Sequence, residues 1–142
     1  MKKILLALSL GASLFAGSIE VNEPYVKITP PNAKNSAIFM KIKNNSNEDV
    51  KLIDAKCDFA QSTEIHTHIH EDGMMKMIRI QDATIPANSS LELKPKSYHV
   101  MLMGIKDSVK EDTKLNLELS FSNGEKLKLK DIPAKAVVPM HH

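Results

Sequence analysis

The apolar residues of this chain come in short runs that alternate with polar residues and stop at turn-forming residues. Side chains that alternate with a period of two indicate strands rather than helices. The clearest run, Lys114–Phe121, is followed by Asn123-Gly124, the strongest short signal for a hairpin, and by a second alternating run at Lys126–Ile132. The sequence therefore predicts an antiparallel hairpin in this region.

Nine strands are predicted on the same grounds, separated by turns at intervals typical of an antiparallel β-sandwich with Greek-key connections. They are Ile19–Ile28, Ser36–Lys43, Val50–Cys57, Thr63–His70, Met74–Ile80, Ser90–Leu93, His99–Met103, Lys114–Phe121 and Lys126–Ile132. A single short helical turn is expected near Ile105–Val109. No internal repeat or long linker interrupts the pattern, so the predicted fold class is all-β with a single domain.

Residues 1–18 have the composition of a secretory signal peptide, with Lys2-Lys3, an apolar run and the small residues Ala16-Gly17-Ser18. The apolar run is too short to span a bilayer, and no cysteine at its end offers a lipid attachment point. We therefore expect an exported protein without stable membrane insertion, a folded domain over residues 19–135 and a flexible tail over residues 136–142.

Composition argues against several functions. The formal net charge of +2 comes without a concentrated basic patch, which gives no support for nucleic-acid binding. The lone Cys57 cannot close an intramolecular disulfide. Its free thiol could in principle bind copper, but a partly buried cysteine of a strand is the favoured interpretation. No arrangement of nucleophile, base and orienting residue is visible, so the protein is not expected to be an enzyme.

Histidines and methionines cluster in one part of the chain. Five of the 8 methionines and four of the 6 histidines lie between positions 66 and 103. In the predicted strand Thr63–His70, every second residue faces the same side. The residues expected on that side are Glu64, His66, His68 and His70, and Met75 and Met77 share a side of the returning strand.

The turn between these two strands decides which residues meet. If the turn is centred between Glu71 and Asp72, His66 lies directly opposite Met77. If Asp72-Gly73 are the two turn residues, His68 lies opposite Met77 and His66 is diagonal to it. In both registers histidine and methionine share a face, and directly opposite residues have Cβ atoms about 5 Å apart.

A second group of candidate ligands lies on the predicted strand His99–Met103. His99, Met101 and Met103 project to one face, and Val100 and Leu102 are expected to face the core. Thioether sulfur and imidazole nitrogen together favour soft copper(I) over magnesium or calcium. The predicted copper(I) ligands are His66, Met77, His99 and Met101.

Single residues of these types are usually structural, and Met40 is predicted to fill the core. A further set could supply auxiliary ligands, form a path for copper, or simply be exposed: His68, His70, Met75 and Met103. The terminal Met140-His141-His142 could collect metal or be inert. The additional histidines could also bind copper(II).

The spacing His66-x10-Met77-x21-His99-x-Met101 resembles that of the periplasmic copper chaperones of the copper-A-centre type, the PCu(A)C-like family. The segments around it, Glu71–Met77 and Leu93–Gly104, and the early segment Ile28–Ala37 resemble the same family, so the resemblance covers nearly all of the chain after residue 18. It implies a cupredoxin-like sandwich, a periplasmic location and a copper(I) site made by the four spaced residues.

The same resemblance implies delivery of copper to the dinuclear copper centre of cytochrome c oxidase, directly or with a thiol-bearing partner of the Sco type. Many members of the family carry a methionine directly after the first histidine, where this chain has Thr67. A residue at that position points to the opposite face of the strand, so the core of the site is expected to survive.

Three other functions compete with delivery. A copper-sequestering resistance protein would use the same ligands, and a metal-free exported β-sandwich could bind another protein. A blue-copper electron carrier needs a Cys thiolate with two His and a weak axial Met, and Cys57 precedes all the candidate ligands.

Overall fold

The computed structural model describes residues 13–137, and this part of the chain contains strands, turns and irregular segments but no helix. Eleven strands follow one another along residues 13–137. They are β1 (Ser13–Ala16), β2 (Ile19–Lys27), β3 (Asn35–Asn44), β4 (Val50–Lys56), β5 (Ala60–Glu71), β6 (Met74–Ile80), β7 (Ala83–Ile85), β8 (Ser90–Leu93), β9 (His99–Ile105), β10 (Lys114–Phe121) and β11 (Lys126–Lys135). The predicted all-β fold class is confirmed.

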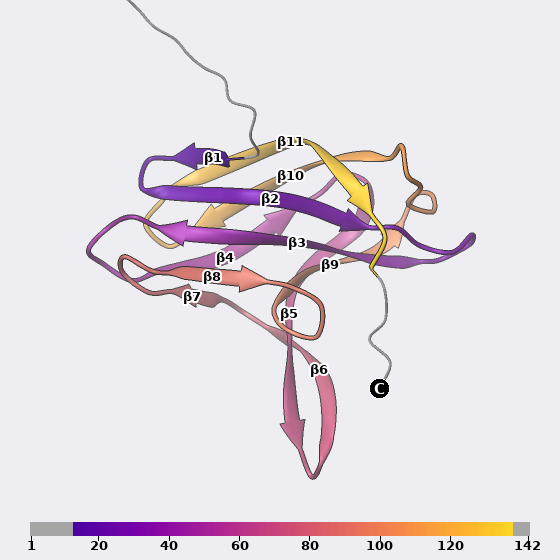
Figure 1. The fold of residues 1–142 in the computed structure, drawn as a ribbon, viewed down its shortest axis with the longest axis horizontal. Coiled ribbons are helices and arrows are strands. Elements are labelled where there is room, and N and C mark those ends of the chain that lie inside the picture. The colour runs from indigo at the N-terminus through magenta and orange to yellow at the C-terminus, as the bar shows by residue number, and fades with distance from the viewer. Residues whose placement is uncertain (1–12, 138–142) are drawn as a thin grey trace, which may run out of the picture.

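The strands form a continuous hydrogen-bonded order, β6-β5-β9-β3-β2-β11-β10-β4-β7, with β1 beside β2 and β8 beside β3. Strand β11 joins the two layers of the sandwich, because it pairs with β10 along most of its length and with β2 at Ala134 and Lys135. The β11–β2 pair is parallel, whereas the other strand pairs of the described residues are antiparallel. Figure 1 shows β2, β3 and β8 running across the molecule, with β4 and β10 behind them.

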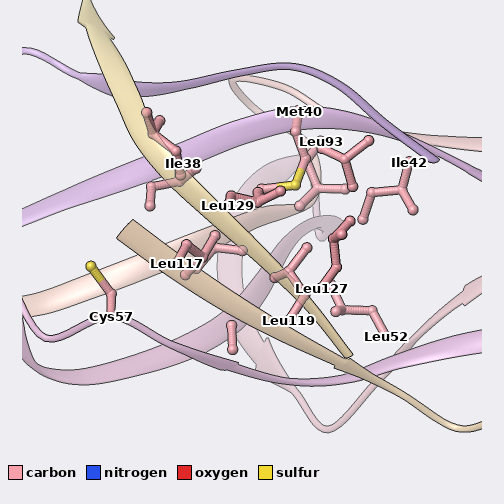
Figure 2. Close-up of a cluster of buried hydrophobic side chains, with 14 of the residues drawn as sticks. Ile38, Met40, Ile42, Leu52, Cys57, Leu93, Leu117, Leu119, Leu127 and Leu129 are labelled. Atoms are coloured by element: carbon pink, nitrogen blue, oxygen red, sulfur yellow. The ribbon is translucent and has the colours of Figure 1, made fainter. Parts of the chain in front are cut away.

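The core lies between the two layers. Figure 2 shows Ile38, Met40 and Ile42 of β3 facing leucines of β10 and β11, including Leu119 and Leu129. In β10 every second side chain is buried, as the alternation predicts. Met40 is 2% exposed, which confirms its prediction as core filler.

Two expectations about local structure were wrong, and one strand besides β1 was missed. The predicted helical turn near Ile105–Val109 is instead the end of β9 and an irregular segment. Val109 exchanges hydrogen bonds with Thr29, donating to the Thr29 hydroxyl and accepting from its amide, so tertiary contacts determine this segment. The short strand β7 was missed, because three residues carry too little alternation to be recognised. Cys57 lies just beyond the end of β4 rather than within it.

The ends of the chain are only partly described. Ser13–Ala16, inside the predicted signal peptide, pairs with β2 as strand β1. Residues 1–12 and the predicted metal-collecting residues Met140-His141-His142 lie outside the described residues, so the signal peptide and the tail stay predictions. No helix among residues 13–137 has the length and apolar character needed to cross a membrane.

The β5–β6 hairpin projects from the sandwich and is the most prominent feature of its outline (Figure 1). Asp72 and Gly73 form its turn with φ angles of 54° and 75°, the left-handed conformation that two-residue hairpin turns of this kind require at both positions. Of the two registers that the sequence allowed, the structure has the second: His68 pairs with Met77, and His66 pairs with Arg79. The turn residues therefore determine which histidine faces the methionine.

Candidate metal centre

Strand β9 carries one half of the candidate site. It lies between β3 and β5, and its residues alternate between the core and the outer face of the layer. Val100 and Leu102 are fully buried, as predicted, which leaves His99 and Met101 on the other face. Direct pairing places Met101 between Ala37 of β3 and Glu64 of β5.

The hairpin carries the other half. His68 and Met77 are directly opposite each other on β5 and β6, and both line an open cavity on the outer face of the layer. His99 and Met101 line the same cavity, together with Ala37 and Phe39 of β3. Two imidazoles and two thioethers thus converge on one hollow whose remaining wall is partly apolar.

His66 approaches this group from its inner side. It pairs directly with His99 across β5 and β9, and the centroids of the two rings are 5.7 Å apart. Its Nε2 lies 2.9 Å from a carboxylate oxygen of Glu64, whose other oxygen is 3.6 Å from Nε of Arg79. Because a carboxylate oxygen accepts, Nε2 carries the proton, and Nδ1 of His66 is left buried without a hydrogen-bond partner.

The loop before β9 orients the other two histidines. The carbonyl oxygen of Ser97 accepts a hydrogen bond from Nδ1 of His99 at 2.9 Å and another from Nδ1 of His68 at 3.3 Å. A carbonyl oxygen has two lone pairs and only accepts, so both rings are protonated at Nδ1 and present a free lone pair at Nε2. Hydrogen bonds of this kind commonly orient metal-binding histidines.

Burial also prepares His99 for a metal. The residue is 4% exposed, and desolvation lowers the pKa of its imidazole from the ordinary value, with smaller lowering contributions from His66, His68 and Lys27. The hydrogen bond to Ser97 acts in the opposite direction without reversing the shift. His99 is therefore neutral near pH 7, the form that binds metal ions.

The remaining auxiliary candidates lie apart from the cavity. Met75 pairs with His70 towards the hairpin tip, and Met75 is 43% exposed. Met103 pairs with Asn35 and Ser62, one step beyond Met101 in the direction away from His99. Thr67 pairs with Ile78 and therefore belongs to the opposite face of the strand, as expected.

Cys57 lies in a different part of the fold. Its thiol is buried, and the hollow that it lines is bounded by residues of β4, β5, β10 and β11 rather than by the candidate ligands. Burial raises the pKa of this thiol above its ordinary value. A blue-copper arrangement, with a Cys thiolate beside two His, is therefore not formed by the described residues.

Sequence reasoning did not find the roles of Ser97 and Phe39. Ser97 contributes its backbone oxygen, which no residue type signals, although its position in the segment Lys94–His99 before a candidate ligand could have drawn attention to it. Phe39 lies in an apolar run that reads as core, yet its ring is 6.2 Å from that of His99. Both depend on strand pairing between distant parts of the chain.

The donor set limits which ion could bind. Among residues 13–137 no group of three or more His, Cys, Asp or Glu side chains is placed to hold a metal ion. A metal at this hollow would therefore need the thioethers of Met77 and Met101. Thioethers bind soft ions, so the residues present fit copper(I) rather than zinc, calcium or magnesium.

Solved structures share this architecture. The copper-bound PCuAC domain from PmoF2 aligns with a TM-score of 0.74 at 18% identity, covering 88% of this chain and 98% of that one. Apo-DR1885 from Deinococcus radiodurans aligns with a TM-score of 0.65 at 28% identity, covering 97% and 92%. Copper(I)-DR1885 from the same organism aligns with a TM-score of 0.58 at 31% identity, covering 80% and 74%. The fold and the His/Met face thus define a PCuAC-like protein, as the ligand spacing predicted.

Sequence comparison gives the family. The family model "Putative lipoprotein LpqE-like" matches residues 19–134, and the chain belongs to this family. A protein of Leifsonia xyli subsp. xyli (strain CTCB07), "Putative lipoprotein Lxx21020", is 29% identical over 110 residues, 77% of this chain and 65% of that protein. "Uncharacterized protein RP573" of Rickettsia prowazekii (strain Madrid E) is 32% identical over 69 residues, 48% of this chain and 38% of that protein. The chain thus matches less than two thirds of the length of either relative.

Proposed function

We propose that this protein is an exported, periplasmic copper(I) chaperone that holds one copper ion with Met77, His99, Met101 and His66. The single observation that carries the proposal is the convergence of two thioethers and buried, neutral imidazole on one face, from strands that are distant in sequence. The printed names of related structures support it, because DR1885 is described as binding copper(I) and the PmoF2 domain as copper-bound.

The proposed ligands are divided between the β5–β6 hairpin and strand β9, an arrangement that suits transfer of a copper ion better than catalysis. Met77 is 46% exposed on the hairpin, whereas His99 is 4% exposed on β9. A partner ligand can therefore reach the ion from the Met77 side and bind before the inner ligands leave. Thioethers need no deprotonation, so release of copper by this route requires no proton transfer from the methionines.

The proposed destination is the dinuclear copper centre of cytochrome c oxidase, reached directly or through a thiol-bearing partner of the Sco type. A copper-sequestering protein would use the same site and differ only in where the ion goes. A metal-free binding module would not need two imidazoles and two thioethers gathered at one cavity. Transfer of copper to an acceptor protein therefore distinguishes delivery from sequestration. Copper binding itself distinguishes both from a metal-free binding module.

The first experiment is an anaerobic copper(I) titration of residues 19–142 in competition with a chelator. A variant with Met77→Leu, His99→Ala and Met101→Leu serves as the comparison, and its urea unfolding curve shows whether it is folded. Tight binding of one ion by the natural sequence, lost in a folded variant, supports the proposal. Equal weak binding by both overturns it. Movement of copper to an oxidase copper domain then distinguishes delivery from sequestration.

A further inference from the structure

Two histidines of β5 have comparable positions relative to His99. The ring centroid of His66 is 5.7 Å from that of His99, and the ring centroid of His68 is 5.5 Å from it. The two residues are separated by one position on a strand, so they share a face. His99 therefore has two histidine neighbours on β5, although the ligand spacing includes only one of them.

The two histidines present different nitrogen atoms. His68 donates from Nδ1 to the Ser97 carbonyl, which leaves its Nε2 free, as in His99. His66 is held through Nε2 by Glu64, which leaves only its buried Nδ1. One backbone oxygen thus orients His68 and His99 in the same way, and a carboxylate orients His66 in another.

Only one of the two lines the hollow with the methionines. His68 is directly opposite Met77, and both line the cavity that also receives His99 and Met101. His66 is opposite Arg79 instead and is 12% exposed in its side chain. An ion that enters through the exposed side of the cavity meets His68 and Met77 before it reaches His66.

We propose that His68 is a copper ligand, and that one copper(I) ion exchanges His68 for His66 while Met77, His99 and Met101 stay bound. The inference rests on the proposed function and deepens it, because it assigns an entry ligand and an inner ligand to one site. In the exchange, the bond from copper to Nε2 of His68 breaks and a bond to Nδ1 of His66 forms. Each imidazole would bind copper through its unprotonated ring nitrogen, copper remains copper(I), and no proton is gained or lost.

The test compares His66→Ala, His68→Ala and the double variant by anaerobic copper(I) competition. His70→Ala is the matched control, because His70 lies on the same face one step further out and pairs with the exposed Met75. We expect each single variant to lose at most about tenfold in affinity, and the double variant to lose more than about a hundredfold. Nitrogen NMR of the natural sequence should show that copper(I) moves the Nε2 resonance of His68.

The outcomes are distinguishable. If His68→Ala behaves like His70→Ala, both alone and when combined with His66→Ala, and the Nε2 resonance of His68 does not move, the inference is overturned while the proposed function stands. If the natural sequence binds copper(I) no better than the Met77, His99 and Met101 variant, the proposed function fails as well. Urea unfolding curves of every variant, including His66→Ala combined with His70→Ala, exclude loss of the fold as the cause.

Discussion

His66 of β5 and His99 of β9 face each other directly across two paired strands, with ring centroids 5.7 Å apart. The β5–β9 ladder continues on one side of this pair, where Ile65 pairs with the buried Val100, and it holds the two backbones together up to His66 and His99. The two rings therefore have little freedom to separate. Met77, which lies opposite His68, is less constrained, since it belongs to β6, the outermost strand of the layer.

Replacing Met77 by Leu should lower copper(I) affinity by more than the roughly 10–100-fold that loss of an outer-shell partner costs. Leucine keeps the apolar volume but has no sulfur lone pair, so binding should fall while stability changes little. Anaerobic competition with a chelator measures the loss. The matched control is Met74→Leu, because Met74 is 63% exposed on the opposite face of the same strand. Equal affinity in the two variants would contradict the assignment.

Glu64→Gln tests the carboxylate that holds His66. Glutamine can offer either an oxygen or an NH2 group, so the preference for one protonation pattern of the imidazole weakens. We expect copper(I) affinity to fall by about tenfold, as for other outer partners of metal-binding histidines. Glu71→Gln is the control, since Glu71 pairs with Lys76 on the exposed hairpin, with both side chains more than half exposed. A loss of affinity in the control of the same size would refute the role of Glu64.

The two tight turns allow a paired test of the hairpin. Gly73 and Gly124 have φ angles of 75° and 90°, and a Cβ at either position would meet nothing within 4 Å. Replacement by alanine should therefore cost only backbone strain, about 1–2 kcal/mol in the free energy of local or global unfolding. Only Gly73→Ala should also weaken copper(I) binding, because its hairpin carries Met77. Weaker binding in Gly124→Ala as well would show that the effect is one of general stability.

Cys57 should react slowly with thiol reagents in the folded protein. Its pKa is raised above the ordinary 9.0, mainly by desolvation, so the reactive thiolate is rare near pH 8. Because the folded pKa is the higher one, the stabilising contribution of this group is present below about pH 9 and is lost as the pH rises through the folded pKa. Alkylation rates with and without urea measure the protection.

Copper(I) binding by a variant without the thiol tests whether Cys57 belongs to the metal site. Cys57→Ala should bind copper(I) as tightly as the natural sequence, because the thiol does not line the His/Met cavity. A blue colour on oxidation, or loss of binding in Cys57→Ala, would instead favour the electron-carrier function.

Much of this architecture could be predicted from residue patterns. The alternation in Lys114–Phe121 and the shared face of His99 and Met101 follow from a side-chain period of two, whereas the Asp72-Gly73 turn was one of two turns that the sequence allowed. The hairpin register could be narrowed to two possibilities but not to one, since both keep histidine and methionine on one face of the hairpin. The strand β7 and the irregular Lys106–Val109 segment depend on partners far away in the sequence, which no local pattern records.

For the candidate site, too, the sequence predicts only a part. It predicts the types of the candidate ligands and the face that they share, but not the orientation of each histidine ring. Ser97 acts through its backbone, and Glu64 selects the protonated nitrogen of His66 through a contact within one strand. Such details require coordinates because they depend on side-chain rotamers, not on which face a residue occupies.

The projecting hairpin has a mechanical consequence. Beyond His66, β5 pairs with β6 alone, so His68 and Met77 belong to a two-stranded ribbon, whereas His99 and Met101 belong to the interior of the layer. Isolated two-stranded ribbons are only marginally stable and open more readily than a packed sheet. A copper ion bound by residues of both would cross-link the mobile end of the β5–β6 hairpin to strand β9 in the interior of the layer. Copper binding should therefore slow amide hydrogen exchange in the β5–β6 hairpin and leave the exchange rates of β10 and β11 unchanged. The rigidity of the hairpin would then depend on whether the protein carries copper.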